Sequence, residues 1–246
     1  MSDTKLAEAI TDIYEQSRRT YGVPRVHAQL AATGYRCGRK RVARLMRQQR
    51  QVGVHARKRW RRSKPTAVSA PDLVRRNFDP AGPDQLWAAD VSQFRTGEGW
   101  LHLAAVLDLW SRRVIGWSMG DSVTTELVTD ALLMAFQRRR PDQRVIHHSD
   151  RGAVYTSLAF SKRITELNFD QSFSGVGSCY DNAAVESFFA TLKRELAWIH
   201  PGVNWSTRKA LRTALFDYIE GFYNPERIQQ RLDHRSPLDF ETSAVA

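Results

Sequence analysis

The sequence predicts an α/β protein in which a mixed five-stranded sheet is flanked by helices, with a small helical domain in front of it. Three observations lead to this prediction. Basic residues concentrate in the first quarter of the chain, apolar residues recur there at helical spacing, and from about residue 77 strand patterns alternate with helix patterns. The 246 residues, 42% of them hydrophobic, suffice to bury a sizeable core.

The charge of the chain is unevenly distributed. Lys and Arg total 37 against 26 Asp and Glu, a formal net charge of +11. Residues 1–64 hold 17 of these cations and 4 of the acids, a net of +13, whereas the remainder stands at −2. A basic head on a near-neutral body indicates a module that binds a polyanion. Nucleic acid fits best, because neutralised phosphates release counterions and so drive binding.

The basic head is predicted to contain three helices, over 4–19, from near Pro24 to near Gly34, and over 38–51. The third has one apolar face and is otherwise strongly basic, so the last two helices are typical of a helix-turn-helix. A basic linker is expected to follow at 61–78. The residues expected to contact DNA in the head and around the linker are Arg39, Lys40, Arg41, Arg44, Arg47, Lys58, Arg59, Arg61 and Arg62.

The body begins with three strand patterns, over 86–94, 100–110 and 112–120, and the short turns between them require antiparallel pairing. The later elements are a helix over 124–140, a strand over 144–150, a helix over 157–168, a strand over 170–174 and a helix over 182–198. Three antiparallel strands followed by alternating helix and strand form the ribonuclease-H-like pattern.

Three carboxylates stand in settings that are unusual for surface charges. Asp90 interrupts an apolar strand, Asp150 follows the fourth strand, and Glu186 flanks the apolar stripe of the long helix. A carboxylate beside a core is costly without a cation, and three converging acids would form an oxygen cage for Mg²⁺ or Mn²⁺. Lys193, two turns after Glu186, would meet a phosphate nearby. From spacing alone, acids serving as helix caps and surface charges remain an alternative.

Several other kinds of site are disfavoured. Cys37 and Cys179 lie far apart without a CxxC, which argues against a disulfide framework and a Cys-rich zinc site. His147 and His148 are adjacent on a strand and face opposite sides, so they cannot chelate one ion together. No stretch resembles a signal peptide or a membrane span. Four tryptophans are expected to pack in the core or at strand ends: Trp87, Trp100, Trp110 and Trp117.

The body resembles the integrase core of bacterial insertion-sequence transposases of the OrfB type, which are similar to retroviral integrases. The resemblance rests on WAAD ending at Asp90, HSDRG containing Asp150, and DNAAVESFF containing Glu186. Thirty-five residues separate Asp150 from Glu186, which is the D-D-35-E spacing of that family. The C-terminal Tyr-Asn, Arg, Leu and Ser-Pro residues resemble its closing motif, and the head resembles the helix-turn-helix that precedes these cores.

The resemblance implies that Asp90, Asp150 and Glu186 form the catalytic, metal-binding triad of a DNA transposase. Such an enzyme would cleave and transfer DNA strands at the ends of its element, using two Mg²⁺ or Mn²⁺ ions. Lys193 would then contact DNA. The residues expected around the triad are His148, Arg151 and Asn182.

The resemblance also implies partners and an organisation. We expect double-stranded DNA from element ends and target, a homo-multimer on that DNA, and fusion to an upstream-frame product, in the bacterial cytoplasm at the nucleoid. The expected division is a helical head at 1–60, the linker at 61–78, an integrase core at 79–200, and a helical extension at 201–246.

The chain departs from the family pattern at three positions. Ala89 stands where Thr is usual, Val154 where Gln is common, and Gln229 where the closing motif commonly has His. No carboxylate is lost, but the polar surroundings of the site are altered. Two alternatives stay open: a DNA-binding regulator with a vestigial core, and a structure-specific nuclease that uses the same triad without joining strands.

Overall fold

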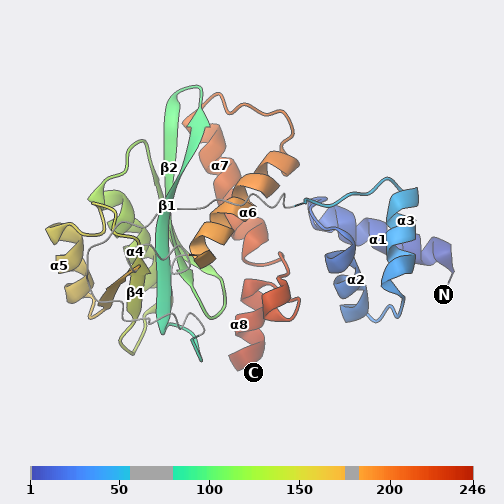
Figure 1. Cartoon of the computed structure of the whole chain (residues 1–246), viewed down its shortest axis with the longest axis horizontal. Coiled ribbons are helices and arrows are strands. Elements are labelled where there is room, and N and C mark those ends of the chain that lie inside the picture. Colours follow the sequence, from blue (N-terminus) through green and yellow to red (C-terminus); the bar gives the residue numbers. More distant parts are fainter. Residues whose placement is uncertain (1, 56–79, 175–182, 246) are drawn as a thin grey trace. The chain divides into compact units, whose positions relative to one another are not determined.

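The computed structural model describes residues 2–55, 80–174 and 183–245 (Figure 1). The chain divides into two compact units. One combines the N-terminal helices with residues 192–203 and 217–246, and the other contains the sheet with its helices. The linker predicted at 61–78 lies outside the described residues, and the four-part division of the chain stays a prediction.

The sheet has the strand order β3-β2-β1-β4-β5. β1 (Leu86–Thr96), β2 (Gly99–Asp108) and β3 (Val114–Gly120) are antiparallel neighbours, as their short turns require. β4 (Ile146–Ser149) and β5 (Asp170–Phe173) extend the sheet in parallel on the other side of β1. This mixed five-stranded sheet confirms the fold class predicted from the sequence.

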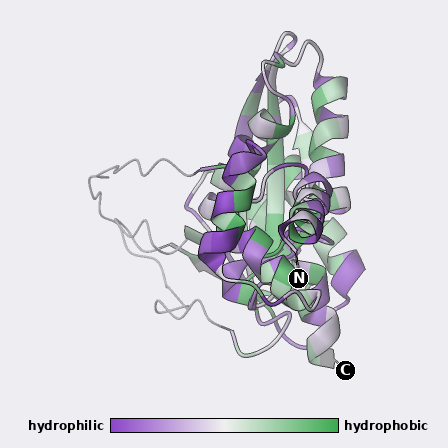
Figure 2. Ribbon diagram, turned by 90° about the vertical axis from the view of Figure 1, so that its right-hand side faces the viewer, coloured by the Kyte–Doolittle hydropathy of each residue, from purple (hydrophilic) through white to green (hydrophobic). Residues whose placement is uncertain are grey.

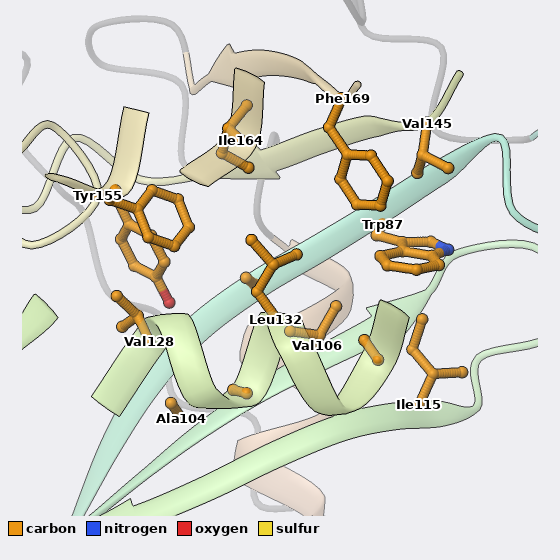
Figure 3. Packing of buried hydrophobic residues seen from close by; sticks show 14 of the residues in the cluster. Trp87, Ala104, Val106, Ile115, Val128, Leu132, Val145, Tyr155, Ile164 and Phe169 are labelled. Carbon is orange, nitrogen blue, oxygen red and sulfur yellow. The ribbon is translucent and has the colours of Figure 1, made fainter. Parts of the chain in front are cut away.

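One face of the sheet forms a core with α4 (Thr125–Arg139) and α5 (Leu158–Glu166). Trp87 of β1 is fully buried there and meets Phe169 edge to face, with ring centroids 5.1 Å apart (Figure 3). Figure 2 shows hydrophobic residues concentrated on the central strands, while the helices carry both hydrophobic and hydrophilic residues. Such two-sided helices are those that cover a sheet with one face and meet water with the other.

The contact between β3 and α4 depends on Gly116. A Cβ atom at this position would lie 2.2 Å from the backbone oxygen of Ala131, so only glycine lets the helix approach the strand this closely. The first half of α6 (Ala183–Ile199) and most of α7 (Arg208–Tyr218) belong to the unit with the sheet, and they lie on the other side of the strands from α4 and α5 (Figure 1).

The first unit is built on a three-helix head, α1 (Asp3–Gln16), α2 (Val23–Ala32) and α3 (Arg39–Gln48). Ser2 caps α1 by accepting a hydrogen bond from the Lys5 amide, and Pro24 occupies the first turn of α2. The predicted apolar faces are those that become buried, so the helical head is confirmed. The segment at 217–246 contains a π-helix (Ile219–Tyr223), a short 3₁₀ helix (Gln230–Leu232) and α8 (Pro237–Val245).

The head and the C-terminal segment of this unit are joined by hydrogen bonds. The Tyr21 hydroxyl accepts from the Ile228 amide at 2.7 Å and donates to the Glu226 carbonyl at 3.1 Å. The Trp198 indole donates to the Arg19 carbonyl at 2.9 Å. Segments from opposite ends of the sequence therefore share one compact unit.

A buried ion cluster lies in the same unit. Arg227 donates two hydrogen bonds to Glu195 of α6, Nε to Oε2 at 2.7 Å and Nη2 to Oε1 at 2.8 Å. The Tyr218 hydroxyl donates to the same Oε2 at 2.7 Å, and Nη1 of Arg25 lies 3.7 Å from Oε1. Burial acts to raise the pKa of Glu195, but the hydrogen bonds and charge of Arg227 outweigh it and hold this pKa below its usual value. Glu195 and Arg227 are therefore both charged, although they are buried inside the unit.

Two tryptophans show the two expected kinds of position, the core and a strand end. Trp87 is buried in the core, and Trp100 is 43% exposed at a strand end. It is the second residue of β2, at the hairpin tip, where it pairs across the strands with Arg95. The Arg95 guanidinium lies 5.9 Å from the indole centroid, so a cation covers a face that the core does not reach.

Candidate active site

Asp90 and Asp150 are brought together by the register of two parallel strands. The last pair between β1 and β4 is Ala88 with His148. Asp90 lies two residues further along β1, and Asp150 lies two residues further along the chain, just past the end of β4. Parallel strands advance together, so both carboxylates come to the same edge, where β4 ends and β1 continues.

The two aspartates line one cavity of about 360 Å³. Asp90 is half-buried and Asp150 is exposed. The full lining is Asp90, Val91, Gln93, His102, Val123, Asp150, Gly152, Ala153, Val154 and Tyr155. The sequence reasoning had not singled out His102, Gly152 or Tyr155. Gly152 and Tyr155 lie within five residues of Asp150, and this proximity in sequence could have identified them.

Local backbone geometry fixes the carboxylate of Asp150. The amide of Gly152 donates to its Oδ1 at 2.9 Å. A Cβ atom at Gly152 would lie 2.9 Å from that oxygen, so any larger residue would have to displace the carboxylate. Asp90 is anchored in a similar way, since its Oδ1 accepts from the Val91 amide at 2.7 Å.

Glu186 enters from the first turn of α6, where the positive end of the helix dipole favours an anion. Partial desolvation raises the pKa of Glu186, and the negative charge of Asp150 raises it further. A cation between two such groups would remove the repulsion.

The oxygen donors suit a hard divalent cation, but they do not form a closed cage. Within the described ranges, no group of three His, Cys, Asp or Glu side chains is close enough to hold a metal ion. Carboxylate oxygens are the ligands that Mg²⁺ and Mn²⁺ prefer, and Mg²⁺ usually keeps several waters and few protein ligands. Three acids that do not enclose the ion leave room for such waters, which suits Mg²⁺.

The flanking residues lie close to the site in sequence but have other partners. His148 is buried, with Nδ1 at 3.1 Å from the Ser172 hydroxyl and Nε2 at 3.3 Å from the Ser174 hydroxyl. Arg151 donates from Nε to the Ser174 carbonyl at 3.1 Å. Both side chains therefore tie the end of β4 to the end of β5. Asn182 lies outside the described residues.

His147 faces the core, away from these partners. Its ring lies 5.4 Å from the ring of Phe160 and 6.1 Å from that of Tyr155. Burial lowers its pKa to about 3, so the imidazole is neutral at physiological pH. The two adjacent histidines thus have different surroundings, in agreement with their separation by the strand.

Asp108 shows that burial of an acid is not sufficient evidence for a site. It is fully buried, and its Oδ2 accepts from the Ser111 amide at 3.0 Å and from the Ser111 hydroxyl at 2.7 Å. Burial raises the pKa of Asp108, yet its hydrogen-bond partners are structural: Ser111 in the turn between β2 and β3, and the Asp84 amide, which donates to Oδ1 at 3.2 Å. We interpret this carboxylate as a structural cap of that turn.

The predicted DNA contacts of the head are partly engaged within the head itself. Asp3 of α1 accepts from Arg41 Nε at 2.7 Å and from Arg44 Nη2 at 2.6 Å. These hydrogen bonds lower the pKa of Asp3, that from Arg44 most strongly. Arg39, Lys40 and Arg47 are exposed on α3. The expected contacts Lys58, Arg59, Arg61 and Arg62 lie outside the described residues.

Lys193 is exposed on α6, two turns beyond Glu186 on the same helix. In the described part of the chain, no helix is long and apolar enough to cross a membrane.

Comparison with known proteins supplies the family. The description "Integrase core domain" matches residues 80–179 and again residues 186–244, and "HTH-like domain" matches residues 2–59. The transposase InsF for insertion sequence IS3A of Escherichia coli K12 is 41% identical over 95% of this chain and 81% of its own length. The transposase for insertion sequence element IS904 of Lactococcus lactis is 35% identical over 96% of this chain and 93% of its own length.

Solved structures share the fold at low identity. The simian T-cell lymphotropic virus intasome, solved with the PP2A regulatory subunit B56 gamma, matches 87% of this chain and 69% of the chain compared, with a TM-score of 0.55 and 18% identity. The HTLV-2 integrase catalytic core domain in complex with magnesium (trimeric form) matches 65% of this chain and 97% of its own, with a TM-score of 0.50 and 18% identity. On the identity with InsF over most of both lengths, the chain belongs to the family of insertion-sequence transposases, with an HTH-like head and an integrase core.

Proposed function

We propose that this transposase cleaves and transfers DNA strands at the ends of its insertion sequence, with Asp90, Asp150 and Glu186 as the catalytic triad. The observation that carries the proposal is the shared cavity of Asp90 and Asp150. The curated relatives are named as transposases for insertion sequences, which supports the same reaction here.

The triad would hold two divalent ions, Mg²⁺ or Mn²⁺. Bound there, the ions would activate the attacking oxygen and stabilise the leaving oxygen of an in-line phosphodiester displacement. The protein's own contribution is to fix the ligands: Gly152 and Val91 orient the two aspartates through their amides, and α6 carries Glu186 to them. The magnesium in the HTLV-2 core structure supports this choice of ion.

DNA would be held by cations outside the cavity. The exposed Arg39, Lys40 and Arg47 of α3 would contact phosphates or base edges, and Lys193 would contact the strand near the triad. Arg41 and Arg44 would join them when DNA competes with Asp3. The proposal also includes phosphate contacts by Lys58, Arg59, Arg61 and Arg62. It further includes support of the triad by His148, Arg151 and Asn182.

Strand transfer needs two element ends in one assembly, so we propose that the chain forms a homo-multimer on DNA. Fusion to an upstream-frame product, and action at the nucleoid in the bacterial cytoplasm, belong to the same proposal. The HTH-like head supports the DNA-binding part of it.

The test compares the wild type with Glu186→Gln on labelled DNA that carries the element's ends, with and without Mg²⁺. We expect cleaved and joined strands only with both the metal and Glu186. Glu126→Gln is the matched control, because Glu126 also lies in the first turn of a helix of the same unit. Unchanged joining by Glu186→Gln would refute the triad. Cleavage without joining would favour the nuclease, and binding without cleavage the regulator.

A further inference from the structure

Tyr155 lines the cavity of the proposed carboxylate site, and hydrogen bonds fix both its backbone amide and its backbone carbonyl. Its amide donates to the Gly152 carbonyl at 3.0 Å, in the turn that also orients Asp150. Its carbonyl accepts from the side-chain amide of Gln171, on β5, at 2.7 Å. The position of Tyr155 is therefore tied both to the turn after β4 and to the neighbouring strand.

The ring of Tyr155 is also fixed. The residue is 2% exposed, and its ring meets that of Phe160 edge to face at 5.4 Å and 82°. Figure 3 shows Tyr155 near Val128, at the opposite end of the core cluster from Trp87 and Ile115. The core therefore holds this ring in one orientation.

The hydroxyl is the feature that the core does not explain. The Tyr155 hydroxyl has no hydrogen-bond partner among the residues that the structure describes, and it is not one of the fully enclosed unpaired polar atoms, so it reaches the cavity rather than the interior of the core. The residue lines the cavity that holds Asp90 and Asp150. Burial raises the pKa of Tyr155 well above its usual value, and the charges of both aspartates raise it further, so the group is a neutral donor facing negative charge.

We propose that Tyr155 is a positioning residue whose hydroxyl hydrogen-bonds a water in the carboxylate cavity. That water belongs to the surroundings that Asp90 and Asp150 offer to a divalent ion, because such ions keep part of their water when bound to few carboxylates. The proposal rests on the proposed metal site. It adds that the affinity of the site depends on a side chain that is not itself a metal ligand.

The test uses the full chain without DNA and measures Mn²⁺ binding by calorimetry. Tyr155→Phe keeps the ring and removes only the hydroxyl. We expect 10–100-fold weaker Mn²⁺ binding, on the order found for groups that support metal ligands, with an unchanged melting temperature in the absence of metal. Strand cleavage by the variant should then approach the wild-type rate at saturating Mn²⁺, because the defect lies in metal affinity.

Tyr14→Phe is the matched control. The Tyr14 hydroxyl donates to the Val52 carbonyl at 2.9 Å in the head, so this variant loses a tyrosine hydroxyl away from the carboxylates. Equal Mn²⁺ affinity in the wild type and Tyr155→Phe would overturn the proposal, as would a defect that appears only with DNA bound. Asp150→Asn separates the two levels of inference: if it too binds Mn²⁺ like the wild type, the proposed metal site itself has failed.

Discussion

Replacing Arg227 with Met should destabilise the unit that contains the head. The substitution keeps an unbranched side chain but leaves the Glu195 carboxylate buried without its two hydrogen bonds from the guanidinium. Both residues are almost inaccessible, with side-chain exposures of 7% and 3%. Breaking a buried pair by removing one partner costs about 3–5 kcal/mol.

The lower end of that range applies here. Arg25 remains 3.7 Å from Glu195, and the Tyr218 hydroxyl still donates to it, so part of the compensation survives. We expect a loss of about 3 kcal/mol in the free energy of unfolding. At roughly 2–4 °C per kcal/mol for a chain of this size, the melting temperature should fall by about 6–12 °C.

The loss should depend on pH. In the wild type the pKa of Glu195 is lowered, so the pair contributes fully at neutral pH and is lost only as the pH falls through that lowered pKa. In the variant, burial should raise the pKa of Glu195, so that mild acid neutralises the stranded carboxylate and relieves its penalty. The stability gap should therefore be widest at neutral pH and narrow toward about pH 4.

The assay is urea denaturation followed by tryptophan fluorescence at several pH values. Arg19→Met is the control, because Arg19 pairs with Glu15 at 2.9 Å on a largely exposed surface. Surface pairs of this kind contribute little, so this variant should match the wild type. A loss below about 1 kcal/mol for Arg227→Met, or a gap that widens in acid, would refute the reasoning.

Three further predictions concern other parts of the chain. Gly152→Ala should displace the Asp150 carboxylate and lower metal-dependent strand cleavage at least tenfold, with DNA binding retained; gel assays of both activities measure this. Gly116→Ala should force β3 and α4 apart, because the new Cβ atom meets the Ala131 carbonyl, and lower stability by about 1–3 kcal/mol in a urea titration. Asp3→Asn should free the two arginines that it holds on α3, giving tighter DNA binding and a steeper salt dependence.

Each of these substitutions has a matched control. Gly82→Ala adds a methyl group 3.5 Å from the Gln85 side chain, an ordinary contact, and should change neither cleavage nor stability. Glu8→Gln removes an acidic charge from α1 at another position, and should leave the salt dependence much closer to that of the wild type than Asp3→Asn does. Full cleavage by Gly152→Ala, or an unaltered salt slope in Asp3→Asn, would contradict the corresponding arguments.

The elements of the fold were predictable because their patterns are local. Alternation and helical spacing predicted the five strands and the head helices, and short turns dictated which strands are antiparallel. The pairing of Ala88 with His148, which sets Asp90 beside Asp150, is not visible in either segment alone. It depends on the register that the two strands adopt when the sheet forms.

Contacts between charges distant in sequence were not predictable. Arg41 and Arg44 fit a DNA-facing helix by pattern, but their pairing with Asp3 depends on how α1 crosses α3. The sequence could not assign Arg227 a buried role, because its partner Glu195 lies 32 residues earlier on another element. Trp100 was predicted to pack in the core or at a strand end, but the sequence could not show that its partner there is the guanidinium of Arg95.

The joining of Tyr21 to Ile228 has a consequence for synthesis of the chain. The two residues are 207 positions apart. At about 5–20 residues per second, the ribosome needs roughly 10–40 s to make the partner of the head after the head itself has emerged. During that time the surface around Tyr21 has no C-terminal segment to cover it. The head is therefore completed late in folding. A nascent chain that stalls during synthesis of the core would present its DNA-binding helices without the C-terminal segment that packs against them.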